Sequence, residues 1–431
     1  MRMMRFDDAG FEEFFRVLVG RGEEPPAGVE QIVADIIDDV RRRGDDALGD
    51  LTRKFDRLDL ASTPIEVGAE EVEQALAALS DESLDILRLA KDRITAFHSK
   101  QKEQTWLSFD EPDVLLGQMV RPLDRVGIYV PGGKAAYPSS VLMNAVPAKV
   151  AGVEEVVMVV PMPGGEVNPH VLAAAHLAGV DRIFRIGGAQ AVAALAYGTE
   201  SVPRVDKITG PGNIYVATAK RQVFGQVDID MIAGPSEILV INDGSGTPAH
   251  IAADLLSQAE HDELASSILI TTDEAFGQEV RSEIDRQLKE LSRETIARKS
   301  IDQFGAIVVA RDLDEAVAFS NRLATEHLEL AVADPFAILP RIRHAGAIFL
   351  GHNTPEAAGD YLAGPNHTLP TGGTARFFSP LSVEDFVKKS SIVSFSRAGI
   401  ERLGRQISQF ADLEGLEAHG RSVTIRLKEQ S

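Results

Sequence analysis

From Val126 onward the sequence repeats one unit: a short run of β-branched residues, a turn rich in glycine or proline, and then small residues typical of a buried helix. Units of this kind begin with VGIYV, VEEVVMVVP, DRIFRIGG and VDKITGPGN. A second series starts at IAGPSEILVI and continues through SSILITT, GAIVVA and GAIFLG. Strands that alternate with helices form parallel sheets covered by helices on both faces. The pattern therefore predicts two α/β domains.

The segments on either side of these repeats differ from them. GVEQIVADIIDDVRRRGDDALGDLTRKFD and EEVEQALAALSDESLDILRLAKDRITAFHSKQK place apolar residues three and four apart, which predicts amphipathic helices in an arm or a dimer contact. Residues 350–380 are rich in glycine and proline, and ordered loops of this length are often functional. The tail from Leu381 reads as a strand and a helix, which indicates a small appended domain.

Composition excludes several classes of function. The 431 residues contain 44 basic and 65 acidic side chains, a net charge of −21, which argues against binding to nucleic acid or to anionic membranes. There is no cysteine, so disulfides, thiolate zinc sites and cysteine nucleophiles are excluded, and any metal must be held by nitrogen and oxygen. Asp7 and Asp8 interrupt any signal peptide, and no apolar run is long enough to span a membrane, so we expect a cytoplasmic protein.

Glycine-rich turns follow three of the predicted strands, at Gly132-Gly133, Gly187-Gly188 and Gly210-Pro211-Gly212-Asn213. Glycine lets the backbone approach a ligand phosphate at the start of a helix. None of the turns is GxGxxG, and tight turns without a ligand explain each one equally well. Three such turns at neighbouring strand ends favour a ligand, because parallel sheets bind ligands at the carboxyl ends of their strands.

Gln258 and His261 lie three residues apart in LLSQAEHDE, near the end of a helix expected to begin around Pro248. Their side chains would leave one face of that helix. A histidine there also makes a favourable contact with the helix dipole, which is the simpler interpretation. If the chain binds a metal, such donors would be needed, with Asp360 from the long loop and His419 from the tail.

Glu326 and His327 are expected at the end of the helix DLDEAVAFSNRLATEHL. Adjacent glutamate and histidine can serve as two proton acceptors on the rim of a cleft. A solvated helix end is the simpler interpretation of the pair on its own.

Taken in order, several motifs closely resemble those of the histidinol dehydrogenases over essentially the whole chain: VGIYVPGGKAAYPSSVLMNAVPAKVAG, KITGPGNIYVATAK, DIDMIAGPSEILVI, LLSQAEHD, TEHLEL and DYLAGPNHTLPTGGTARF. The resemblance implies an NAD-dependent homodimer with one Zn²⁺ per subunit and shared active sites. Such an enzyme oxidises L-histidinol to L-histidinal and then to L-histidine, the last steps of histidine biosynthesis.

The resemblance also implies roles for individual residues. The expected zinc ligands are Gln258, His261, Asp360 and His419, and the expected proton acceptors are Glu326 and His327. The expected NAD contacts are Tyr129, Gln190 and Asn213. The expected substrate contacts are Ser236, Gln258, His261, His327, Asp360, Glu414 and His419, with His367 nearby. Glu414 and His419 would complete the site of the neighbouring subunit.

The implied fold has two incomplete Rossmann-like parallel-sheet domains, an N-terminal helical arm and a small, dimer-swapped C-terminal tail. The expected domains are residues 1–25 with 107–129 and 237–381 for the catalytic α/β domain, 26–106 for the arm, 130–236 for the NAD-binding domain and 382–431 for the tail.

Oxidation of an alcohol to an acid removes four electrons, so two hydrides must pass to two NAD molecules. Without a cysteine to form a thiohemiacetal, the second step should proceed through the hydrated aldehyde. We expect His327 to take the alcohol proton and then a diol proton, and Glu326 to activate the water. Zinc would orient the substrate through its amino and imidazole nitrogens.

Three alternatives remain at this point. A paralogous NAD- and zinc-dependent dehydrogenase could act on another small polar alcohol, such as a sulfonated propanediol, and a substrate panel separates the two. A zinc hydrolase would use a metal-bound water and would need no nucleotide turns. A non-catalytic scaffold would explain neither the Glu326-His327 pair nor the long loop.

Overall fold

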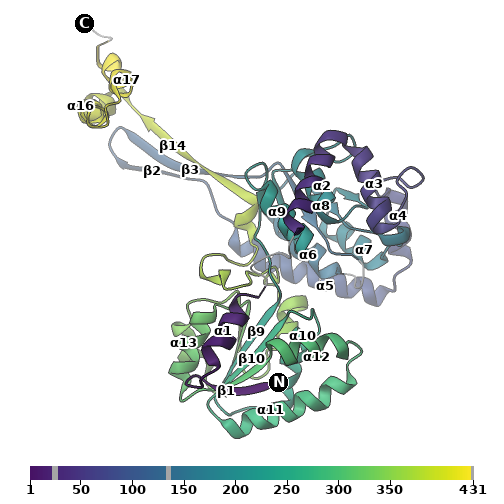
Figure 1. Cartoon of the computed structure of the whole chain (residues 1–431). Helices are drawn as coiled ribbons and strands as arrows, with labels where there is room; N and C mark the ends of the chain where they lie inside the picture. Colours follow the sequence, from purple (N-terminus) through teal and green to yellow (C-terminus); the bar gives the residue numbers. More distant parts are fainter. Residues whose placement is uncertain (22–27, 133–136, 429–431) are drawn as a thin grey trace. The chain divides into compact units, whose positions relative to one another are not determined.

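The computed structural model describes residues 1–21, 28–132 and 137–428. Gly133 and the expected domain boundary at residues 25 and 26 lie outside this part of the chain. The chain divides into two compact units (Figure 1). The main unit comprises Met1–Gln101 and Leu123–Phe386, and the tail unit comprises Lys102–Pro122 and Val387–Ser431.

The first series of repeats forms a five-stranded parallel sheet with the order β6-β5-β4-β7-β8. Its strands are β4 (Arg125–Tyr129), β5 (Glu155–Val159), β6 (Arg182–Phe184), β7 (Lys207–Thr209) and β8 (Asp228–Ile229). The connecting helices are α6 (Pro138–Ala151), α7 (Pro169–Ala178), α8 (Gly188–Tyr197) and α9 (Ile214–Val223). Because chain order reverses between β4 and β7, their carboxyl ends form the place where such sheets bind nucleotides.

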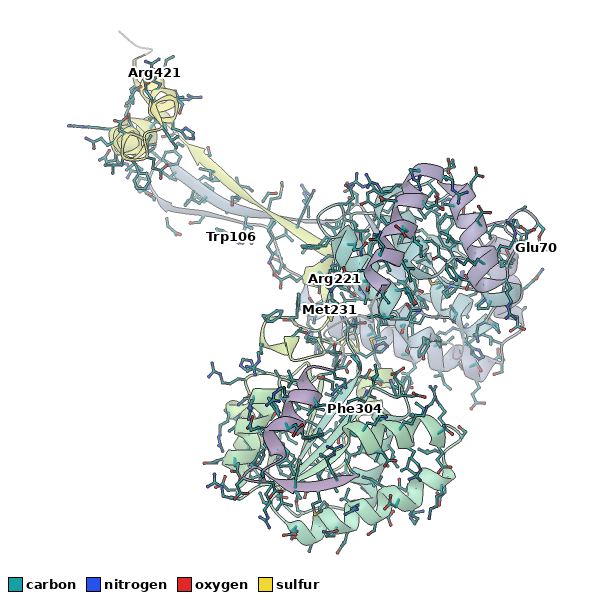
Figure 2. All side chains as sticks on the ribbon, in the orientation of Figure 1. Glu70, Trp106, Arg221, Met231, Phe304 and Arg421 are labelled. Atoms are coloured by element: carbon teal, nitrogen blue, oxygen red, sulfur yellow. The ribbon has the colours of Figure 1, made fainter. Side chains whose placement is uncertain are left out.

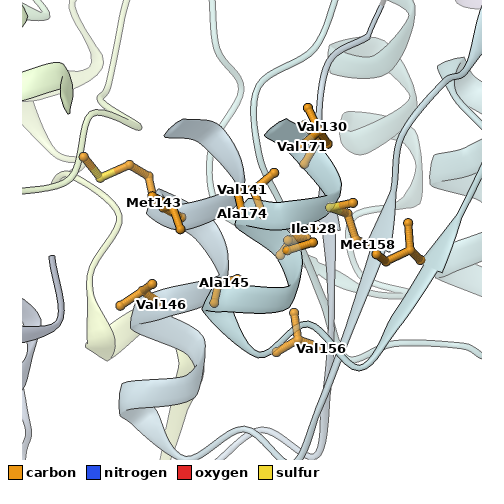
Figure 3. Packing of buried hydrophobic residues seen from close by; sticks show 14 of the residues in the cluster. Ile128, Val130, Val141, Met143, Ala145, Val146, Val156, Met158, Val171 and Ala174 are labelled. Atoms are coloured by element: carbon orange, nitrogen blue, oxygen red, sulfur yellow. The ribbon is translucent and has the colours of Figure 1, made fainter. Parts of the chain in front are cut away.

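The early amphipathic helices are present, and they cover this sheet. They are α2 (Val29–Arg43), α3 (Asp45–Asp56), α4 (Ala69–Ala77) and α5 (Asp81–His98). On one face Val33 and Ile37 of α2 share a core with α8 and α9. On the other, α4 and α5 complete the core between β4 and helices α6 and α7, where Ile128 and Met158 pack (Figure 3). The first hundred residues therefore belong to the main unit, whereas the sequence suggested a separate arm.

The second series forms a six-stranded parallel sheet with the order β1-β11-β10-β9-β12-β13. Its strands are β1 (Arg2–Arg5), β9 (Glu237–Asn242), β10 (Ser266–Thr271), β11 (Ala306–Val309), β12 (His327–Ala331) and β13 (Ala347–Leu350). The helices are α1 (Phe11–Val19), α10 (Pro248–Ala259), α11 (Glu274–Gln287), α12 (Glu294–Phe304), α13 (Leu313–Leu323) and α14 (Pro335–Ile338). The prediction of two parallel α/β sheets is confirmed, and β1 is an edge strand that the sequence pattern did not reveal.

The glycine- and proline-rich segment after β13 contains short helical pieces. They are α15 (Glu356–Ala358) and a π-helical turn, η5 (Gly359–Ala363). Glu356 and Asp360 are carried by these pieces. The backbone N–H of Glu356 donates to the Glu329 carboxylate of β12 at 2.9 Å. The long loop therefore brings two carboxylates back to the six-stranded sheet.

The tail unit has an antiparallel sheet with the order β14-β3-β2, followed by two packed helices (Figure 1). Its elements are β2 (Trp106–Glu111), β3 (Val114–Pro122), β14 (Val387–Phe395), α16 (Arg397–Leu413) and α17 (Glu417–Lys428). The strand and first helix were predicted, whereas α17 was not. The expected domains placed residues 107–129 in the catalytic domain, and this is wrong. Strand β3, within that range, pairs along its whole length with β14 of the tail unit, and β4 belongs to the five-stranded sheet. None of the described helices has the length and apolarity to cross a membrane.

Candidate active site

Glu326 and His327 lie at the amino end of β12 rather than at the end of a helix. Helix α13 stops at Leu323 because Ala324 adopts a left-handed conformation, with φ of 55°. His327 then opens β12, opposite Ile238 of β9. The sequence prediction for this pair was therefore wrong about the element and the exposure, since both side chains are buried. The helix pattern hid the short break between α13 and β12.

The His327 imidazole is held as a neutral proton acceptor. Its Nδ1 lies 3.1 Å from the carbonyl oxygen of Glu237, and because a carbonyl can only accept, Nδ1 carries the hydrogen. Nε2 is buried without a hydrogen-bond partner among the described residues and lies 3.8 Å from Asp360 Oδ1. Burial lowers the pKa of His327 to about 3. Burial therefore keeps the Nε2 lone pair free of a proton at neutral pH, as a proton acceptor requires.

Glu326 is the second buried acid–base group. Its Oε2 accepts a hydrogen bond of 2.9 Å from the backbone N–H of Glu237 and lies 3.7 Å from His327 Nδ1. Burial raises its pKa well above the usual range, and the nearby charges of Glu237 and Asp360 raise it further. A glutamate whose pKa lies above its usual value is suited to exchange protons near neutral pH.

Three donor groups converge beside His327. One ligand atom from each of His261, Glu356 and Asp360 lies within 4.8 Å of the others. His261 follows the end of α10, so the prediction that α10 begins at Pro248 and presents this residue near its end is confirmed. Glu356 was missed by the sequence analysis, although its position four residues before Asp360 is a spacing that places two carboxylates on one side of a helical turn.

Gln258 lies in the last turn of α10 and is fully buried. When its amide nitrogen faces Glu356, the nitrogen donates to both carboxylate oxygens, at 2.9 and 2.5 Å, and also lies 3.3 Å from His327 Nδ1, whose hydrogen is directed at the Glu237 carbonyl oxygen. The amide oxygen is then left for another partner. Gln258, His261 and Asp360 are thus brought together as predicted, with Glu356 as an added member.

The electrostatics of this cluster fit a divalent cation. Burial raises the pKa of Asp360 to about 6 and that of Glu356 well above its usual range, and it lowers the pKa of His261. The raised pKa values disfavour the ionised, metal-binding form of the two carboxyl groups, and a cation between them would offset that effect. The lowered pKa keeps the histidine in its neutral, metal-binding form. Imidazole nitrogen with amide and carboxylate oxygen is a donor set that accepts zinc.

The residues expected to contact NAD lie around the five-stranded sheet. Tyr129 ends β4 and is buried, and its hydroxyl accepts a hydrogen bond of 3.0 Å from the N–H of Gly188. Burial raises its pKa to about 12. Gln190 is buried in the first turn of α8, and the Asn213 side chain caps α9 by accepting from Tyr215 and Val216.

Close packing requires glycine at one described position of each of the three turns. A Cβ atom on Gly210, which has φ of 109°, would lie 2.1 Å from the carbonyl oxygen of Tyr129. Cβ atoms on Gly132 and Gly187 would each lie within 2.5 Å of Pro161. Tight packing therefore explains these glycines without a ligand. The close approach of β4 and β7 also places the Gly210 turn at the carboxyl ends of these two strands, where the strand order reverses.

The remaining predicted residues are divided between the two units. Ser236 directly precedes β9, and half-buried His367 is close enough to His261 and His327 for its charge to lower the pKa of His327. Glu414 and His419 lie in the tail unit, at the end of α16 and within α17, and both are exposed. Within the main unit, the described cluster is therefore built without them.

The fold and this site define a class: a two-sheet α/β enzyme that sets a neutral histidine and a buried glutamate beside a cluster of nitrogen and oxygen donors. A family model described as histidinol dehydrogenase matches residues 20–427. The histidinol dehydrogenase of Syntrophotalea carbinolica is 74% identical over 429 residues, which cover 100% of both chains. That of Geobacter sulfurreducens is 72% identical over 429 residues, covering 99% of this chain and 100% of its own.

A solved structure of histidinol dehydrogenase from Elizabethkingia anophelis matches with a TM-score of 0.94 and 38% identity, covering 100% of this chain and 98% of its own. The chain therefore belongs to the histidinol dehydrogenase family. The expected family, the parallel α/β fold class and the enzyme class, a dehydrogenase acting on an alcohol and an aldehyde, are confirmed, whereas the dimer-swapped tail stays a prediction. The paralogue, hydrolase and scaffold alternatives are not favoured.

Proposed function

We propose that this protein oxidises L-histidinol to L-histidinal and then to L-histidine, transferring two hydrides to two molecules of NAD. The observation that carries the proposal is the buried, neutral His327, whose unpartnered Nε2 lies beside the donor cluster. The similar histidinol dehydrogenases from S. carbinolica and G. sulfurreducens support the same substrate.

The two catalytic residues divide the proton transfers. His327 Nε2 takes the hydroxyl proton of the alcohol, and later a proton of the hydrated aldehyde, as the hydride leaves the same carbon. Glu326 activates the water that hydrates the aldehyde, because burial raises its pKa and so strengthens it as a base. One site can serve both oxidations since the alcohol and the gem-diol present the same O–H and C–H pair.

Gln258, His261 and Asp360 would hold one Zn²⁺ per subunit, with His419 of the tail as a further ligand. Bound zinc would supply a Lewis acid that orients the amino and imidazole nitrogens of histidinol. Glu356 orients the Gln258 amide so that its oxygen is available. Ser236, Glu414 and His367 complete the proposed substrate contacts.

NAD is proposed to bind at the carboxyl ends of β4 and β7. The support is the reversal of strand order there, with Tyr129 and the Gly210 turn in contact and the start of α9 nearby. Tyr129, Gln190 and Asn213 are the proposed contacts. In this proposal the five-stranded sheet, β4 included, and its helices bind NAD, and the six-stranded sheet forms the catalytic domain.

We also propose a homodimer in which the tail unit pairs with a second copy of the chain. The tail unit exposes large apolar side chains on its sheet and helices, including Trp106 (Figure 2): Trp106, Leu107, Phe109, Val393, Phe410, Leu413 and Ile425. Exposed apolar surfaces of this kind mark interaction sites. The partner copy would receive Glu414 and His419. The cytoplasmic location stays a prediction.

The test is the stoichiometry of the reaction. Purified protein is mixed with limiting L-histidinol and excess NAD, and the NADH formed per histidinol is counted with and without a chelator. Two NADH per histidinol, lost on chelation and restored by zinc, are expected. One NADH with free aldehyde would overturn the role of Glu326, and no NADH would overturn the proposed substrate.

A further inference from the structure

Glu237 contacts both catalytic residues although it lies outside the donor cluster. Its backbone N–H donates to Glu326 Oε2 at 2.9 Å, and its carbonyl oxygen accepts from His327 Nδ1 at 3.1 Å. Its side chain reaches back, and Oε2 accepts from the backbone N–H of Glu326 at 3.3 Å. Residue 237 therefore sets the rotamer of one catalytic side chain and the tautomer of the other.

The carboxylate of Glu237 is in turn held by Arg21, from the short segment that follows α1. Arg21 Nη2 donates to Glu237 Oε1 at 2.8 Å, and the two side chains are 1% and 6% exposed. Arg21 Nη1 donates to the carbonyl oxygen of Leu18, and its guanidinium lies over the ring of Phe304. The arginine is thus held by Leu18 of α1 and Phe304 of α12 while its Nη2 donates to Glu237, and its buried Nε has no hydrogen-bond partner among the described residues.

The ionised form of Glu237 is the one that satisfies all its neighbours. Besides Arg21, the groups around the carboxylate are the N–H of Glu326 and the N–H of Gly372, which donates to Oε1 at 3.3 Å. All three are donors, so a protonated or amide side chain would turn a hydrogen toward another hydrogen. Burial favours protonation of Glu237 and so raises its pKa, and the charge of Arg21 opposes that shift.

We propose that Arg21 and Glu237 are positioning residues that hold Glu326 and His327 in their reactive geometry at the amino ends of β9 and β12. This inference rests on the proposed function, since it assigns the two held residues to catalysis. The hydrogen bonds of Arg21 go to Leu18 and Glu237 and not to the donors His261, Glu356 and Asp360, so loss of the pair should alter turnover without altering zinc content. The N-terminal segment is then part of the catalytic apparatus.

The experiment uses the full-length holoenzyme and the variants Arg21→Met, Arg21→Lys and Glu237→Gln. Misplacement of a catalytic group by about 1 Å can cost about 100-fold in rate. We therefore expect Arg21→Met to lower kcat about 10- to 100-fold with either histidinol or histidinal. Glu237→Gln should show a similar loss. KM for histidinol should change by less than about threefold, because the ligand cluster is intact. Arg21→Lys should restore part of kcat, since an ammonium group can still donate to Glu237.

Two further variants keep the test decisive. Arg21→Met combined with Glu237→Met removes both charges at once, which buried ion pairs often tolerate, so this protein should fold even if the single variant does not. Its kcat should still be low and its zinc content normal. Arg182→Met is the matched control, because Arg182 pairs with Glu66 through two hydrogen bonds in the other sheet and should leave kcat unchanged.

The outcomes separate the inference from the proposed function. A wild-type kcat in Arg21→Met, or a loss of zinc and melting temperature that accounts for the whole loss of activity, would overturn the positioning role. Absence of NADH production by the wild-type enzyme would instead overturn the proposed function.

Discussion

In the five-stranded sheet the proposed NAD turns follow the carboxyl ends of β4 and β7, whereas in the six-stranded sheet Glu326 and His327 lie at the amino ends of the strands. Both sheets are parallel, and each has a place where chain order reverses, between β4 and β7 and between β9 and β12. Ligands usually bind at the carboxyl side of that place. The second sheet departs from the rule.

The difference arises because side chains and a loop occupy the carboxyl ends of β9 and β12 in the six-stranded sheet. At the carboxyl ends of β9 and β12, the Asn242 side chain donates to the carbonyl oxygens of Ser245 and Ala331. Asp243 accepts from the N–H of Ala333, and His352 packs against Gly246. The loop after β9 therefore closes this crevice with its own hydrogen bonds. The proposed catalytic residues lie at the opposite edge, where α10 ends and the loop after β13 returns.

The sharpest test of this division is His327→Gln. Removing a general base costs about 10²- to 10⁴-fold in rate, so kcat should fall by that factor for both histidinol and histidinal. Equilibrium binding of NAD should not change, because His327 belongs to the other sheet. Steady-state rates and calorimetric NAD binding check this, and a large loss of NAD affinity would contradict the separation of the two edges.

Glu326→Gln should slow mainly the step that needs hydration.

The donor cluster is tested by Asp360→Asn, with Glu356→Gln as its partner variant. Loss of a direct ligand should weaken zinc by more than about 100-fold, whereas loss of the group that orients Gln258 should weaken it by about 10-fold. Competition with a chromophoric chelator measures both. Equal losses would make Glu356 a direct ligand, and no loss in either would remove the cluster from metal binding.

His419→Asn tests the tail in the same assay and should yield folded protein with weak zinc affinity.

Gly210→Ala should affect the five-stranded sheet alone. The new methyl group would meet the Tyr129 carbonyl, and a left-handed conformation costs a non-glycine residue about 1–3 kcal/mol, so the NAD affinity and melting temperature should both fall. Gly225→Ala is the control, because Gly225 also has a positive φ of 97°, but a Cβ atom there would meet no other atom within 4 Å. Similar losses of NAD affinity in the two variants would show strain alone to be responsible.

The smallest effect is the pH dependence of stability that arises from His327. Its pKa is about 3 in the folded protein, below its ordinary value, so the unfolded state binds the proton first as the pH falls. Stability is therefore full above about pH 6.5 and is lost as the pH falls toward about 3. Between about pH 7.5 and 5 the loss should be about 2 kcal/mol. Unfolding curves of metal-free wild type and His327→Gln isolate this contribution, and equal pH dependence would show that His327 is not buried as a neutral group.

Part of the site was predictable from short motifs, and the exceptions have two causes. Gln258 and His261 share a helix end, and Asp360 lies in a loop whose composition already indicated function. Glu326 and His327 were placed on the wrong element, because apolar spacing in LATEHLEL suits a helix and a strand alike. Glu356 and Arg21 were missed, since their partners are far away in the sequence.

The sequence by itself determined the alternation of strands and helices, the nitrogen- and oxygen-donor character of any metal site and the identity of the motif residues, because these depend on local pattern and composition. Only the tertiary structure decided which sheet edge holds the chemistry and which groups support it. Arg21 meets Glu237 across 216 positions, and Glu237 meets Glu326 across 89. The second contact arises because the parallel strands β9 and β12 are neighbours, and the first because the segment after α1 packs beside β9; burial and the charges nearby then decide which of these groups remain ionised.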